Sequence, residues 1–112
     1  MVELSKISCE ACKTDAKKLS DQEISEQIAQ LPEWSVVTEG EEDIKKLRKT
    51  FKFKNFVDAL AFTNKVGALA EEQGHHPDLL TEWGKVTVTW WSHKIKGLHQ
   101  LDFVLAFKCE TL

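Results

Sequence analysis

The 112-residue sequence lacks the long apolar segments that membrane insertion and export require. No apolar run approaches the roughly 20 residues of a membrane-spanning helix, and residues 1–18 contain no hydrophobic stretch typical of a secretion signal. An excess of positive charge is also missing, because 15 Lys and Arg face 18 Asp and Glu, for a formal net charge of −3. Such a chain has no net field to attract nucleic acid or anionic lipid. We therefore expect a cytoplasmic protein that binds neither a membrane nor nucleic acid directly.

Cysteine is scarce, and the number of cysteines is odd. Cys9, Cys12 and Cys109 argue against a disulfide framework and predict reduced thiols. Cys9 and Cys12 form a CxxC motif, typical of half a zinc site or of a redox pair, but no second CxxC and no His-x-x-x-His follows it. Cys109 lies near the end of an amphipathic segment, where a thiol usually packs as a small hydrophobic group. A Cys-His nucleophile pair has no support, and a small zinc protein stays an alternative.

Glycine-rich phosphate-binding loops are absent as well. The sequence contains neither Gly-x-Gly-x-x-Gly nor a Walker sequence, so nothing indicates a nucleotide site. What is present is the composition of one globular domain, with 42% hydrophobic and 29% charged residues. Residues 1–18 are polar, rich in Lys and without periodicity, and we interpret them as a flexible leader. Residues 19–112 are expected to form a single domain without metal or cofactor.

Helical and strand periodicities alternate along this domain. The capping-box sequence Ser20–Glu23, followed by apolar residues at helical spacing up to Pro32, predicts a helix over 21–31. Residues 34–37 and 43–54 read as strands joined by a turn at 39–42, and the second strand alternates apolar and polar side chains. Asn55 can cap a long central helix that ends near Gly74.

The last third of the sequence adds a second pair of strands and a final helix. Strands are predicted over 79–83 and 86–91, and a third helix begins at about Gln100. The order α-β-β-α-β-β-α packs most simply as one four-stranded antiparallel sheet with its helices on one face. We therefore predict an α+β fold.

Three histidines lie where a scaffold of this kind displays reactive groups. His75 and His76 begin the loop after the central helix, and His93 ends the last strand. An imidazole both takes and gives a proton near neutral pH, so several in one pocket suit a reaction that removes one proton and delivers another. Pro77 stiffens the backbone after the paired histidines, which cannot both point the same way. Solvated surface histidines are the alternative interpretation.

Two carboxylates are candidates for orienting these imidazoles. Glu71 precedes His75 by four residues, so one helical turn would bring its carboxylate close to that ring. Asp102 falls in the first turn of the third helix, where the helix dipole alone favours an acid. The alternative for Glu71 is a solvated acid at a helix end. The alternative for Asp102 is a favourable interaction with the helix dipole alone.

The spacing of these residues resembles a family signature. Its seven positions are Glu71, His75, His76, Pro77, Trp83, His93 and Asp102. This pattern is similar to that of the pterin-4a-carbinolamine dehydratase family, and the likeness extends to Leu31–Trp34, Val86–Thr89 and Gly97-Leu98, covering about residues 20–108. Two departures stand out. Gly74 replaces an Asp of some members, so any role of that acid is absent. His99 replaces a Ser or Thr that caps the third helix in many members, which implies either a weaker cap or a fourth imidazole near the site.

The resemblance implies a hydro-lyase with a pterin as its substrate and no cofactor. Such an enzyme removes water from 4a-hydroxytetrahydropterin, the product left by an aromatic amino acid hydroxylase, and forms quinonoid dihydropterin. By position, the catalytic residues would be His75 and His93 as acid and base, and His76 holding the pterin. The same comparison assigns substrate-orienting or lining roles to Glu71, Asp102, Trp34 and Pro77.

The family also implies a homodimer or homotetramer and a functional link to a hydroxylase. In its animal members the same fold stabilises dimers of a transcription factor. A non-catalytic protein that stabilises the oligomer of a partner is therefore the alternative hypothesis. A complete set of histidines favours the enzyme, because a pure adaptor has no use for them.

Overall fold

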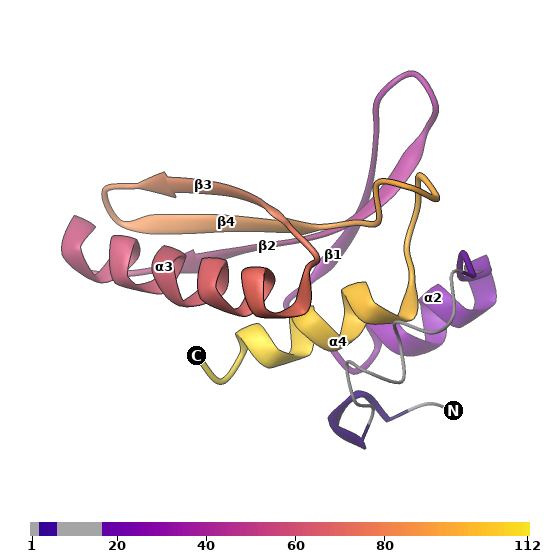
Figure 1. Ribbon diagram of the computed structural model, residues 1–112, viewed down its shortest axis with the longest axis horizontal. Coiled ribbons are helices and arrows are strands. Elements are labelled where there is room, and N and C mark those ends of the chain that lie inside the picture. Colours follow the sequence, from indigo (N-terminus) through magenta and orange to yellow (C-terminus); the bar gives the residue numbers. More distant parts are fainter. Residues whose placement is uncertain (1–2, 7–16) are drawn as a thin grey trace.

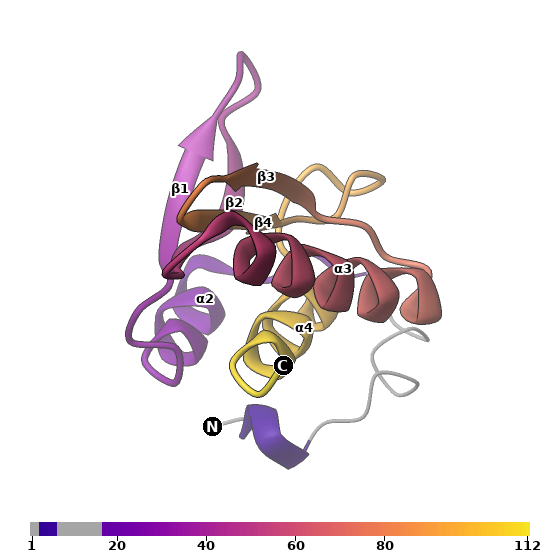
Figure 2. The same ribbon diagram turned by 90° about the vertical axis from the view of Figure 1, so that its left-hand side faces the viewer.

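Four antiparallel strands form one sheet, and the helices cover one of its faces (Figures 1 and 2). The computed structural model describes residues 3–6 and 17–112. In chain order the elements are η1 (Leu4–Lys6), α2 (Asp21–Ile28), β1 (Ser35–Glu39), β2 (Ile44–Lys52), α3 (Phe56–Gln73), β3 (Asp78–Glu82), β4 (Lys85–Trp90) and α4 (Gln100–Cys109). The strands lie in the order β1-β2-β4-β3. The predicted α+β fold and its order of elements are confirmed, with η1 as an addition.

The helix boundaries follow from local capping. The Ser20 hydroxyl accepts from the Glu23 amide at 3.2 Å, and the Glu23 carboxylate accepts from the Ser20 amide at 2.9 Å. Asn55 Oδ1 caps α3 by accepting from the amide of Asp58 at 2.8 Å, and Gly74 ends that helix in the left-handed conformation with φ 63°. A glycine adopts this conformation without steric cost. The predicted caps of α2 and α3 are therefore correct.

Several boundaries differ from the sequence prediction by one to three residues, and two of these differences change where a turn lies. The helix predicted to reach residue 31 ends at Ile28, because the amide of Leu31 bonds to the carbonyl of Ile28 in a tighter i to i+3 turn before Pro32. Strand β1 runs on to Glu39, which pairs with Ile44. The turn is thereby shifted to residues 40–43.

The core lies between the sheet and the helices. On β4 the alternation predicted from sequence places Val86, Val88 and Trp90 in the core. Helix α4 is buried along residues 101–106, because the sheet covers one side of it and η1 packs against it as well. Leu4 of η1 belongs to this core, and its amide donates to Gln30 Oε1 at 2.9 Å.

The sequence prediction missed η1, because a single turn of three residues with one apolar side chain gives no periodicity. The CxxC motif of Cys9 and Cys12 lies outside the described residues. Within residues 3–6 and 17–112, no helix combines the length and the apolar character needed to cross a bilayer.

Candidate active site

A cavity of about 600 Å³ opens between the end of α3, the loop after β4 and the start of α4. Its lining consists of Gln73, Gly74, His75, His76, Ser92, His93, Lys94, Ile95, His99 and Leu101. The fold therefore brings all four histidines of the chain to one cavity. Three of them were predicted site residues, and His99 is a fourth imidazole beside them.

His75 is held by a buried carboxylate. Its Nε2 lies 2.6 Å from Oδ1 of Asp102, a side chain with 0% exposure. The His75 ring also stacks over Trp90, with ring centroids 5.9 Å apart and an interplanar angle of 4°. Because a carboxylate only accepts hydrogen bonds, His75 donates from Nε2, and in the neutral ring Nδ1 is then the acceptor. Asp102 thus fixes both the orientation and the tautomer of His75.

The other oxygen of Asp102 is also occupied. Oδ2 accepts from the Ser92 hydroxyl at 2.7 Å and from the backbone amide of His99 at 2.9 Å. The second of these bonds is half of a capping box, in which His99 Nδ1 accepts from the amide of Leu101 at 3.0 Å. His99 therefore caps α4 itself while its side chain lines the cavity. Asp102 therefore does more than interact with the helix dipole, because its two oxygens link the cap of α4 to His75.

Glu71 does not meet the histidine that its spacing suggested. The structure corrects this expectation, because Glu71 Oε2 lies 3.0 Å from Nε2 of His76 instead of approaching His75. The left-handed turn at Gly74 rotates the chain, and the amide of His75 bonds back to the carbonyl of Ala70 at 3.1 Å. His75 points inward with 16% of its side chain exposed, whereas His76 is 61% exposed. The two adjacent imidazoles therefore point in different directions, as expected.

His93 lies on the rim of the cavity, in the loop that follows β4. The strand ends at Trp90, so His93 is three residues beyond it and not at its last position. A bridge between Ser92 and Gly97 closes the loop, with the Ser92 amide donating to the Gly97 carbonyl at 2.9 Å. The His93 ring stacks on Trp91, with centroids 3.9 Å apart and an angle of 25°.

Two predicted residues lie away from the cavity lining. Trp34 is buried in the core, where its ring packs edge-on against Phe51 and its indole N–H donates to Glu110 at 3.3 Å. The structure thus corrects the expectation that Trp34 lines the site. Pro77 follows His76 and leads into β3 without lining the cavity. The sequence reasoning missed Ser92 as a contact of Asp102. It left two outcomes open for His99, and the structure shows that His99 keeps the cap of α4 and also adds a fourth imidazole to the cavity.

The described residues contain no cluster of three or more His, Cys, Asp or Glu side chains arranged to hold a metal ion. Cys109 is buried, and this burial raises the pKa of its thiol to about 12. A thiol with this pKa is almost fully protonated at neutral pH and is a poor nucleophile. A Cys-His nucleophile pair that uses Cys109 is therefore not supported.

The fold and the cavity define a class of protein: a small α+β domain with a histidine-lined cavity. A family model described as pterin 4 alpha carbinolamine dehydratase matches residues 17–112. A protein of Nitrosococcus oceani, named as a candidate pterin-4-alpha-carbinolamine dehydratase, is 55% identical over 112 residues, which are 100% of this chain and 97% of that protein. The chain belongs to the pterin-4-alpha-carbinolamine dehydratase family.

Solved structures share this fold. A crystal structure of a transcriptional coactivator/pterin dehydratase from Brucella melitensis superposes with a TM-score of 0.76 at 28% identity, and covers 85% of this chain and 97% of that one. A pterin dehydratase-like protein identified as a RuBisCO assembly factor in the alpha-carboxysome gives a TM-score of 0.55 at 23% identity, and covers 70% of this chain and 89% of that one. The second likeness concerns the fold alone.

Proposed function

We propose that this protein dehydrates 4a-hydroxytetrahydropterin to quinonoid dihydropterin by histidine acid–base catalysis. The observation that carries the proposal is the convergence of the imidazoles on one cavity, with His75 fixed by the buried carboxylate of Asp102. Membership of the dehydratase family supports a pterin as the substrate.

The reaction needs two proton transfers and no change of redox state. One proton leaves N5 of the pterin, a second is delivered to the 4a-hydroxyl group, water departs, and a double bond forms between C4a and N5. His75 and His93 share these transfers in the proposal, and His76 holds the pterin. Both rings are suited to this work, because an imidazole within hydrogen-bond reach of the substrate can take or give a proton near neutral pH. Asp102 orients His75, and the exposed Glu71 orients His76.

The physiological setting is part of the same proposal. The carbinolamine is the product that an aromatic amino acid hydroxylase leaves after using its tetrahydropterin, so the protein would serve the recycling of that cofactor. We also expect a homodimer or homotetramer, because an antiparallel sheet with open edge strands is readily covered by a second copy.

The decisive experiment follows the ultraviolet absorbance of freshly generated 4a-hydroxytetrahydropterin with a trace of protein and a chelator present. We expect accelerated decay with many turnovers per chain. The double variant His75→Ala/His93→Ala, shown by circular dichroism to be folded, should lose this acceleration. An inactive but folded wild-type protein would refute the dehydratase, and an active double variant would refute the roles given to the two histidines.

A non-catalytic binding role is the second candidate function. The Brucella melitensis relative is named both a transcriptional coactivator and a pterin dehydratase. In the present protein, the outer side of α3 exposes the apolar side chains of Phe56, Val57 and Leu60. An exposed apolar patch is typical of a protein-binding surface. A stoichiometric partner captured equally well by the wild-type protein and by a His75→Ala variant, together with an absence of turnover, would favour this candidate.

A further inference from the structure

The three imidazoles assigned to the reaction are held in different ways. His75 and His76 each place a ring nitrogen against a carboxylate oxygen, at 2.6 Å and 3.0 Å. His93 forms no hydrogen bond with the described residues, and its ring contact is the stack on Trp91 at 3.9 Å. An imidazole held through its face keeps both ring nitrogens available for a ligand. One held through a nitrogen has only one left.

Trp91 is itself held from the open face of the sheet, the face opposite the helices. Residues 87, 89 and 91 alternate onto this face, since Val86, Val88 and Trp90 point into the core. The ammonium group of Lys46, on the neighbouring β2, lies 4.4 Å from the centroid of the Trp91 ring. A cation over an indole face is attracted by the π-electrons of the ring. The half-buried indole is thereby restrained on the side of the sheet that carries no helix.

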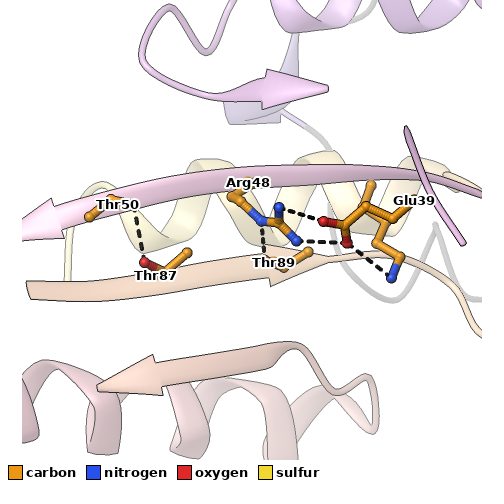
Figure 3. A network of polar contacts seen from close by, with 6 residues as sticks. Glu39, Arg48, Thr50, Thr87 and Thr89 are labelled. Carbon is orange, nitrogen blue, oxygen red and sulfur yellow. Dashed lines mark hydrogen bonds and ion pairs between the residues drawn. The ribbon is translucent and has the colours of Figure 1, made fainter. Parts of the chain in front are cut away.

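A polar network places Lys46 in turn. Its ammonium group forms an ion pair with Glu39 at 3.4 Å, and only 14% of its side chain is exposed. Figure 3 shows Arg48 holding the same carboxylate with two parallel hydrogen bonds, both 2.8 Å long, and donating from Nε to the hydroxyl of Thr89 at 2.9 Å. We call Glu39, Lys46, Arg48 and Thr89 the open-face network. The two parallel hydrogen bonds from Arg48 fix the Glu39 carboxylate. Because Lys46 pairs with the same carboxylate, the position of its ammonium group is fixed as well.

We propose that Trp91 is a positioning residue for His93, and that the open-face network supports it through Lys46. The indole face sets the plane of the imidazole on the cavity rim, while both ring nitrogens stay open to the substrate. The inference rests on the proposed dehydratase function, in which His93 moves a proton. It adds to that function a set of supporting residues on the face of the sheet opposite the helices and Asp102.

Kinetic variants test this role. Trp91→Ala should lower kcat about 10- to 100-fold, since small misplacements of a reacting group cost up to that much, while KM changes little. Trp91→Phe keeps an aromatic face and should restore kcat to within about threefold of wild type. Lys46→Met should lower kcat about two- to fivefold, the rate equivalent of one weak cation–π contact. Lys52→Met is the matched control, because Lys52 lies on the same face of β2 and forms no ion pair with the described residues, and it should leave kcat unchanged.

A spectroscopic signature separates positioning from loss of fold. The ring protons of His93, identified by their disappearance in His93→Ala, should show the upfield shift that a stacked indole causes. This shift should vanish in Trp91→Ala and persist in Lys52→Met. If Trp91→Ala does not fold, Trp91→Leu removes the aromatic face while keeping apolar bulk, and it provides the same comparison.

Three results would overturn the inference. They are an unshifted His93 resonance in the wild-type protein, an unchanged kcat in folded Trp91→Ala, and a raised KM with kcat intact, which would make Trp91 a substrate contact. A wild-type protein without turnover would instead refute the proposed function. The His93 resonance would then still decide whether Trp91 holds this ring.

Discussion

Asp102→Asn is the change that most directly tests the arrangement around His75. The carboxylate accepts three hydrogen bonds, from His75 Nε2, the Ser92 hydroxyl and the His99 amide. An asparagine has one oxygen, and two of the three donors converge on the Oδ2 position. The oxygen is therefore expected at that position, which turns the new NH₂ group toward His75.

Two consequences follow for His75. If its proton stays on Nε2, two donors face each other in a fully buried site, and the free energy of unfolding falls by about 1 to 3 kcal/mol. If the proton moves to Nδ1, the hydrogen bond is kept but the tautomer is inverted. In either case the ring no longer offers the same nitrogen to the substrate, and kcat should fall at least about 100-fold, the scale of one general acid–base catalyst.

The assay combines pterin turnover with urea denaturation of the same samples. Glu71→Gln is the stability control, because it makes the same carboxylate-to-amide change in the exposed pair with His76 and should alter unfolding by no more than about 0.5 kcal/mol. Wild-type kcat in Asp102→Asn would show that neither the orientation nor the tautomer of His75 matters to the reaction. Loss of kcat equal to that of His75→Ala would support the reasoning.

Two further predictions concern parts of the fold outside the cavity. Leu4→Ala should lower the free energy of unfolding by about 2 to 5 kcal/mol, as a large-to-small change in a core does, whereas the exposed Lys6→Ala should not; equal effects would contradict the packing of η1 on α4. Arg48 lowers the pKa of Glu39 from 4.5 to about 2. Because the folded-state pKa is the lower one, the stabilisation is present above about pH 4.5 and is lost as the pH falls toward 2. The difference in unfolding free energy between the wild type and Glu39→Gln should therefore shrink over that interval in acid denaturation, and a constant difference would exclude the ion pair as its cause.

Much of the fold was predictable because its signals are local. The capping sequences at Ser20 and Asn55, the left-handed glycine at position 74 and the alternation along β4 each depend on a few neighbouring residues. The boundary differences at the end of α2 and of β1 lie where two or three residues can satisfy their backbone groups either in the element or in the adjoining turn.

The candidate site was predictable as a set of residues but not as a set of contacts. The spacing of histidines and acids indicated the family, which the comparisons confirm. Spacing paired Glu71 with the wrong histidine, since the left-handed turn at Gly74 changes the direction of the chain between them. The family resemblance also implied that Trp34 lines the site, although the tryptophan packs on Phe51 in the core.

The sequence by itself thus determined the elements, their order and the chemical character of the site, because periodicity, caps and motif spacing act over a few residues. The tertiary structure alone decided which groups meet. Asp102 reaches His75 across 27 residues, and Lys46 reaches Trp91 from another strand. Such contacts depend on how the strands align and how the loops close, and no short stretch of the chain specifies either.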